Sequence, residues 1–145
     1  MANTALRAET EQIAETVTFR NDKHKQFFLE YLPKCRYVDA YHAALIYCLG
    51  IDGDTRCNIH NIYDLKSGCV KIECLHEPWI TSGSARIIRM AYNLYTDGTP
   101  SVEDCKVSKK KLAECRQYTV GELFCCSYAK YFWQAIKIRY PEYCC

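Results

Sequence analysis

The sequence predicts an all-α fold, a compact single-domain bundle of about six helices. Apolar residues recur along most of the chain with the three- and four-residue spacing of helices, and capping residues, glycines and prolines stand where such segments would begin and end. A length of 145 residues suits one hydrophobic core, and no repeat, low-complexity block or linker divides it. Only Val70, Ile72 and Cys74 alternate with polar residues, so the prediction admits one short strand pair near residues 62–74.

The first half of the chain carries two strong helical signals. Residues 1–20 have only a thin apolar stripe and are expected to form an N-terminal helix or a loose arm, followed by one helical domain over residues 21–145. The next helix is expected to begin after Asn21, a favourable N-cap residue, and to stop at Pro33. The clearest pattern covers residues 39–49 and ends at a glycine.

Three more helices are predicted in the second half. Residues 55–65 are expected to form one continuous helix after an Asp-Gly-Asp turn, and another helix follows the polar cluster at residues 81–84. The last one begins with a capping box formed by Thr119 and Glu122 and reaches about residue 139. Because this last segment is apolar around most of its circumference, we expect it to lie at the centre of the bundle.

Composition restricts the compartment and the class of partner. Nineteen basic and 17 acidic residues give a formal charge of +2, which does not by itself indicate a nucleic-acid or membrane surface. No apolar run approaches the ~20 residues of a membrane span, and the N-terminus lacks a signal peptide. We therefore expect a cytoplasmic protein whose 11 cysteines are free thiols, most of them packed as small hydrophobic residues. No phosphate-binding or dinucleotide-binding loop occurs, so no organic cofactor is predicted.

A zinc site is the alternative interpretation of some of these cysteines. Structural zinc takes four cysteine or histidine ligands, usually in pairs two to four residues apart. The pair Cys57 and His60 has this spacing, and Cys69, Cys74 and His76 follow within the same short stretch. The sequence therefore leaves open a zinc-stabilised module with these five candidate ligands.

Two catalytic arrangements are also conceivable on the predicted 55–65 helix. Arg56, His60 and Asp64 would share one face, and an arginine that holds a phosphate beside a histidine that moves a proton is what RNA cleavage requires. The Arg-to-His spacing is similar to, but one residue shorter than, the motif of small helical ribonucleases of the higher eukaryote and prokaryote nucleotide-binding type. Asp39 and His42 could join His60 and Asp64 in metal-assisted hydrolysis, although no adjacent His-Asp dipeptide occurs.

Basic side chains on two predicted helices form a candidate binding surface. Arg86, Arg89 and Asn93 line one side of the helix that follows residue 84, and Lys130 and Lys137 lie on the polar stripe of the last helix. Three further lysines at residues 109–111 and nearby aromatic residues would suit nucleic acid. These aromatic residues are Tyr92, Tyr131, Trp133 and Tyr140. A protein is nevertheless the expected partner, because acidic residues are almost as numerous as basic ones; the oligomeric state stays open.

The order of several short motifs resembles a family of small bacterial proteins whose function is not described. The resemblance would cover the chain from about residue 21 to its end. It is carried by the following residues: Thr55-Arg56, Tyr63-Asp64, Trp79, Thr81, Arg89, Ala91-Tyr92-Asn93-Leu94-Tyr95, Leu123-Phe124-Cys125-Cys126 and Arg139-Tyr140-Pro141-Glu142-Tyr143. The resemblance implies a compact accessory or mobile-element protein and supplies no catalytic residue or cofactor.

The function that these observations favour is non-enzymatic binding of another macromolecule. No complete catalytic set is present, and 12 tyrosines and two tryptophans supply the residue types that dominate interface energies. The resemblance would make the protein an inhibitor or accessory factor in the conflict between bacteria and mobile elements. A small metal-independent ribonuclease and a zinc-stabilised module remain the alternatives.

Overall fold

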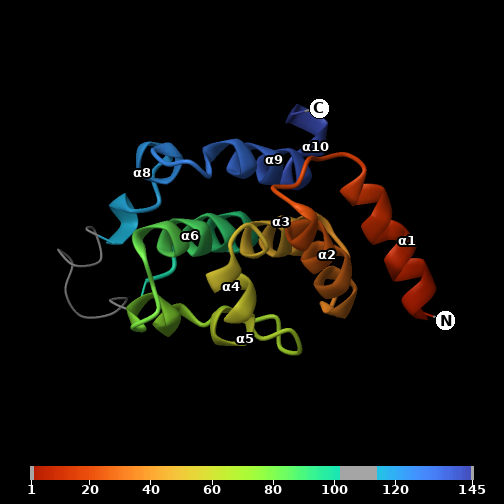
Figure 1. Ribbon diagram of the computed structural model, residues 1–145, viewed down its shortest axis with the longest axis horizontal. Helices are drawn as coiled ribbons and strands as arrows, with labels where there is room; N and C mark the ends of the chain where they lie inside the picture. The colour runs from red at the N-terminus through yellow and green to blue at the C-terminus, as the bar shows by residue number, and fades with distance from the viewer. Residues whose placement is uncertain (1, 102–113, 145) are drawn as a thin grey trace.

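A computed structural model of the chain describes residues 2–101 and 114–144. The fold is helical, as the sequence predicts, and its centre is α3 (Ala40–Leu49), in which every residue from His42 to Leu49 is buried. α6 (Ser82–Thr96) and α9 (Ala129–Arg139) pack against α3, and α2 (Asp22–Tyr31) covers another side. Figure 1 shows α9 on one side of the α3–α6 layer, with α4 (Gly53–Cys57) and α5 (Ile59–Ile62) on the other.

The remaining elements are short or peripheral. α1 (Ala2–Ala14) lies at the edge of the molecule and contacts α2 and the 3₁₀ turn η1 (Leu32–Lys34). A second 3₁₀ segment, η2 (Ile72–His76), precedes α6, while α8 (Val120–Phe124) and α10 (Pro141–Cys144) flank α9. Among the described residues, no helix combines the length and the apolar character needed to cross a membrane.

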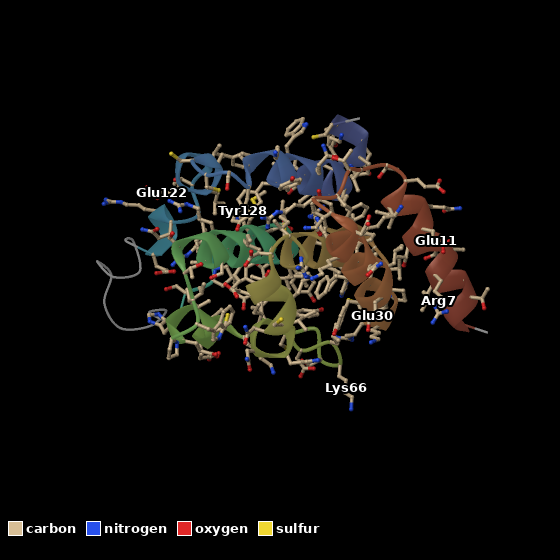
Figure 2. All side chains as sticks on the ribbon, viewed as in Figure 1. Arg7, Glu11, Glu30, Lys66, Glu122 and Tyr128 are labelled. Carbon is tan, nitrogen blue, oxygen red and sulfur yellow. The ribbon has the colours of Figure 1, made fainter. Side chains whose placement is uncertain are left out.

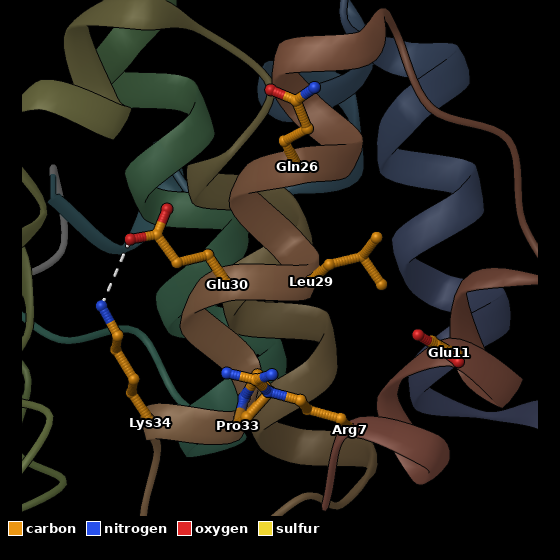
Figure 3. A pocket seen from close by; sticks show the side chains of 7 residues that line it. All are labelled: Arg7, Glu11, Gln26, Leu29, Glu30, Pro33 and Lys34. Atoms are coloured by element: carbon orange, nitrogen blue, oxygen red, sulfur yellow. Dashed lines mark hydrogen bonds and ion pairs between the residues drawn. The ribbon is translucent and has the colours of Figure 1, made fainter. Parts of the chain in front are cut away.

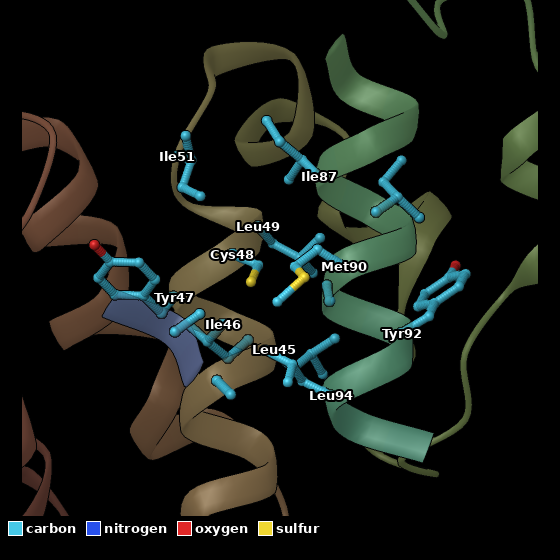
Figure 4. Close-up of a cluster of buried hydrophobic side chains, with 14 of the residues drawn as sticks. Leu45, Ile46, Tyr47, Cys48, Leu49, Ile51, Ile87, Met90, Tyr92 and Leu94 are labelled. Atoms are coloured by element: carbon cyan, nitrogen blue, oxygen red, sulfur yellow. The ribbon is translucent and has the colours of Figure 1, made fainter. Parts of the chain in front are cut away.

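The core forms mainly where α3 meets α6. Leu45 and Leu49 of α3 pack in the same cluster as Ile87 and Met90 of α6 (Figure 4), and all four are at least 97% buried. Burial of such side chains stabilises a fold by roughly 1.5–3 kcal/mol each relative to exposure. The α3–α6 layer is therefore the rigid base on which the outer helices are held.

Polar side chains start the main helices where the sequence predicts them. Asn21 and Asp39 accept the backbone N–H three residues ahead, at the starts of α2 and α3. Thr81 does the same for Ser84, whose hydroxyl accepts the N–H of Thr81 in return, which completes a capping box. Such caps are worth about 1 kcal/mol each.

The predicted continuous helix over residues 55–65 is wrong. It is divided at Asn58, whose φ of −108° and ψ of 19° end α4 before α5 begins. The Asn58 side chain donates to the carbonyl of Asp54 at 2.8 Å, one of the local bonds by which asparagine competes with helix formation. Ile59 and Ile62, one helical turn apart, are then buried, so burial in the core is gained without a continuous helix.

The strand pair near residues 62–74 is reduced to one isolated bridge between Tyr63 and Val70. Gly68, with φ of +73°, makes the turn between them, a conformation that side-chain-bearing residues rarely adopt. Residues 72–76 then turn into η2 rather than continue as a strand. The described residues contain no further β structure.

The predicted long terminal helix is also interrupted, and it is not central. Thr119 does cap α8, but Cys125, with φ of −86° and ψ of 53°, separates α8 from α9. α9 buries Phe132 and Ala135 against the core and exposes Trp133 to 49%. α3 takes the central position because it is buried on all sides from His42 to Leu49.

Candidate functional site

The three residues of the ribonuclease hypothesis do not lie on one helix. Arg56 lies in α4 and donates from Nη1 to the carbonyl of Gly50 at 2.7 Å. His60 lies in α5 with an exposed side chain. Asp64 follows α5, and its carboxylate accepts the N–H of Lys66 at 2.9 Å, a bond that lowers the pKa of Asp64. Figure 2 shows Lys66 projecting from this turn, away from the body of the protein.

The structure separates the candidate zinc ligands by exposure. Cys74 is fully buried, lies 3.3 Å from the hydroxyl of Tyr92, and has its pKa raised to about 11 by burial. The other four candidates, by contrast, are exposed: Cys57, His60, Cys69 and His76. Over residues 2–101 and 114–144, no three histidine, cysteine, aspartate or glutamate side chains gather as ligands for a metal ion.

Asp39 and His42 do meet, at the start of α3. The Nδ1–H of His42 donates to Oδ1 of Asp39 at 2.7 Å, which leaves the lone pair of the neutral imidazole on Nε2. That nitrogen is buried and has no hydrogen-bond partner in the described part of the chain. The rings of Tyr37 and Tyr95 lie against the imidazole, with centroids 5.9 and 5.2 Å away. The pair is thus oriented like a base but closed to a substrate.

Cys35 is a buried thiol that interacts electrostatically with the carboxylate of Asp39. Burial, with the nearby carboxylate adding to it, raises the pKa of Cys35 to about 12. A nucleophilic cysteine needs a lowered pKa, because the thiolate is the reactive form. This corner of the fold therefore offers no activated nucleophile.

The part of the predicted binding surface that lies on α6 forms hydrogen bonds and an ion pair within the protein. Arg86 donates from Nε to the carbonyl of Glu122 at 3.0 Å, and Arg89 pairs with Glu114 at 3.1 Å. In the same way, Asn93 donates to the carbonyl of Gly98 at 2.8 Å. These three residues hold α6 to the segments around it, so each has a structural role within the fold. The lysines at residues 109–111 lie outside the described residues.

The part of the predicted binding surface that lies on α9 forms no ion pair within the described part of the chain. Lys130, Trp133 and Lys137 are spaced by three and four residues, which places them on one face of the helix. Trp133 is 49% exposed, and neither lysine forms an ion pair with any described residue. Lys130 lies over the ring of Tyr131, 5.3 Å from its centroid. We call Lys130, Trp133 and Lys137 the α9 face.

From the sequence, Trp133 is predicted only to be one of several aromatic residues that could stack on a base. Its spacing to the two lysines is the signal that singles it out, because a tryptophan between lysines at i−3 and i+4 falls on the polar side of a helix. Tyr92, by contrast, is fully buried and donates to the carbonyl of Ile62 at 2.7 Å.

A groove with a volume of about 630 Å³ lies between α1 and α2. Figure 3 shows Leu29 of α2 facing Glu11 of α1, while Glu30 extends from α2 toward Lys34. Glu30 pairs with Lys34 at 3.3 Å on an exposed surface, a contact worth little energy. Because charges of both signs alternate around it, the groove favours no ligand charge.

Comparison with protein families gives a match over most of the chain. A family model described as a family of unknown function, DUF6075, matches residues 14–145. All of α1 except its last residue lies outside the matched region. No curated protein and no solved structure matches the chain significantly.

Proposed function

Since the chain belongs to the DUF6075 family, whose function is unknown, we propose from its own residues that it is a non-enzymatic protein that binds another protein through the α9 face. The observation that carries the proposal is the half-exposed Trp133 between two unpaired lysines. Tryptophan is among the residues most often found at the energetic centre of protein interfaces.

The candidate catalytic groups support the same reading. The guanidinium of Arg56 donates to the carbonyl of Gly50, and the buried Nε2 of His42 is covered by tyrosine rings. A ribonuclease needs an arginine that holds a phosphate beside its histidine, and of the proposed pair His60 is exposed whereas Arg56 is bonded within the fold. Arg56 and His42 instead stabilise the ends of α3.

A protein suits the α9 face better than a nucleic acid does. A nucleic-acid surface usually carries a basic patch that contacts many phosphates. Here two lysines flank one tryptophan, and the arginines that the sequence adds to the surface are bonded inside the fold. The finer proposal of an inhibitor or accessory factor in the conflict between bacteria and mobile elements rests on the sequence resemblance alone, and that of a cytoplasmic location rests on the sequence pattern.

The test is capture of a partner from the native cell with tagged protein. We expect a specific, stoichiometric partner that binds the wild type and is lost with Trp133→Ala. Val120→Ala is the matched control, because Val120 is an apolar residue 72% exposed on α8, away from the α9 face. Equal recovery by Trp133→Ala, or recovery of nucleic acid in place of a protein, contradicts the proposal.

A further inference from the structure

A small apolar pocket adjoins the α9 face. It has a volume of about 350 Å³ and lies where α1 meets the end of α9 and the start of α10. Figure 1 shows these ends of the three helices close together. The residues that line it are Gln12, Ile13, Thr16, Lys137, Ile138 and Pro141. The volume is at the lower end of the range for ligand pockets, which suits one or two apolar side chains.

The charge around this pocket is one-sided. Lys137 is the single charged residue among those that line it, and it has no ion pair within the described residues. The two acidic residues nearest to it in the sequence, Glu11 of α1 and Glu15 just after α1, line a separate hollow with Lys25 of α2. An occupant of the pocket therefore meets a positive charge at the rim and no carboxylate in the lining.

The pocket and the α9 face form one surface, because Lys137 belongs to both. From Lys137 the helix leads back to Trp133 after one turn and to Lys130 after two, a distance of about 10 Å along the axis. A short peptide segment can cover this length. The surface thus offers an apolar hole at one end, an exposed indole in the middle and an ammonium group at each end.

We infer that the partner presents an acidic peptide segment with an apolar anchor residue. The anchor enters the pocket between α1 and α9, and carboxylates on either side of it meet Lys137 and Lys130. This inference rests on the proposed function and adds the chemistry of the partner. It also gives the end of α1 a role, since Gln12 and Ile13 of α1, with Thr16 just after it, form one wall of the pocket.

The experiment is selection of binding peptides from a random library displayed on phage, with the full-length wild-type protein as bait. We expect the selected peptides to combine acidic residues with a leucine, isoleucine or aromatic anchor. Their affinity should fall by about tenfold or more with Lys137→Glu, because like charges then face each other. It should also fall with rising salt.

A second variant tests the pocket without changing its charge. Thr16→Trp places an indole at the exposed rim and should block entry of the anchor, so the selected peptides should bind it at least about tenfold more weakly. Thr4→Trp is the matched control, because Thr4 is exposed too but lies on α1 about 13 Å along the helix axis from Ile13 of the pocket wall. Circular dichroism and the melting temperature establish that each variant is folded.

Neutral or basic selected peptides, an empty selection, or equal binding to Lys137→Glu and Thr16→Trp would overturn the inference. Displacement of the peptides by oleate would instead identify a lipid carboxylate as the occupant and overturn it as well. Failure of the proposed function gives a different result. If the proposed function is wrong, Trp133→Ala captures the native partner as efficiently as the wild type does.

Discussion

Acidification from pH 7 to pH 4 should destabilise the protein through His24. The imidazole is fully buried between Phe19 and Tyr47, with ring centroids 5.0 and 4.5 Å away. Its Nε2–H donates to the carbonyl of Tyr47 at 2.8 Å, and its Nδ1 accepts the N–H of Arg20 at 3.0 Å. Both nitrogens are therefore satisfied by the neutral form. Burial lowers the pKa of His24 from 6.5 to about 4, against the opposing effect of the Tyr47 hydrogen bond, and the charges of Arg56 and Arg20 lower it further.

The magnitude follows from the difference between the two states. In the unfolded chain His24 binds a proton below about pH 6.5, whereas in the folded protein it stays neutral down to about pH 4. Between these values the unfolded state binds more protons, so the free energy of unfolding falls by about 1.4 kcal/mol per pH unit. The contribution of His24 is fully present above pH 6.5, and a total of about 3 kcal/mol is lost by pH 4.

Urea unfolding at several pH values measures this loss, and NMR titration of the imidazole C–H signals assigns it to a residue. His60 and His76 are exposed, so His60→Gln and His76→Gln are the controls and should leave the pH slope unchanged. His24→Gln should be less stable at pH 7 and should lose the slope between pH 6.5 and 4. A His24 signal that titrates near pH 6.5 in the folded protein would refute the reasoning.

Three further results are expected. Gly50→Ala should lower the free energy of unfolding by about 2 kcal/mol, because the added Cβ would lie 2.8 Å from Cδ2 of His24. Gly121→Ala is the control: a Cβ there would have no neighbour within 4 Å among the described residues, so this variant should be neutral or slightly stabilising in the same urea assay. Arg139→Ala should lower the free energy of unfolding by about 2 kcal/mol, and Arg139→Lys should lower it by nearly as much. The reason is that the guanidinium stacks 3.6 Å from the centre of the Tyr41 ring and donates to the carbonyl of Leu94. Retention of full stability by the lysine variant would show that charge alone suffices. Purified protein should show no RNA cleavage that His60→Ala removes, and elemental analysis should find zinc far below one equivalent; a His60-dependent nuclease activity, or stoichiometric zinc, would contradict the binding proposal in its present form.

The predictable part of the fold is the part that local chemistry determines. Asn21, Asp39 and Thr81 start helices in the structure because a side-chain oxygen satisfies backbone N–H groups that every helix leaves free. The breaks at Asn58 and Cys125 could not be predicted in this way. Both segments keep helical spacing of apolar residues, and only the packing of the finished core decides whether the backbone stays continuous between them.

The candidate site shows the same division. Spacing predicts that Lys130 and Lys137 share a face, because both lie in one unbroken helix. It cannot reveal that Arg89 meets Glu114, since that pair joins segments 25 residues apart. Spacing also misplaces Arg56 relative to His60, because the helix that was expected to carry both does not form as one unit.

Most of the basic side chains that build this fold are arginines, although Lys71 also donates to a main-chain carbonyl, that of His60. A guanidinium is planar, carries five donors and is more weakly hydrated than an ammonium group, so it can cross-link carbonyl groups at helix ends at low cost. Five arginines donate to main-chain carbonyls from other segments or helix ends, and these are Arg20, Arg36, Arg56, Arg86 and Arg139. Lys130 and Lys137, with strongly hydrated ammonium groups, stay unpaired at the surface beside Trp133. A formal charge of +2 therefore conceals two populations of basic residues, one structural and one free, and only the free one can give the α9 face its preference for acidic segments.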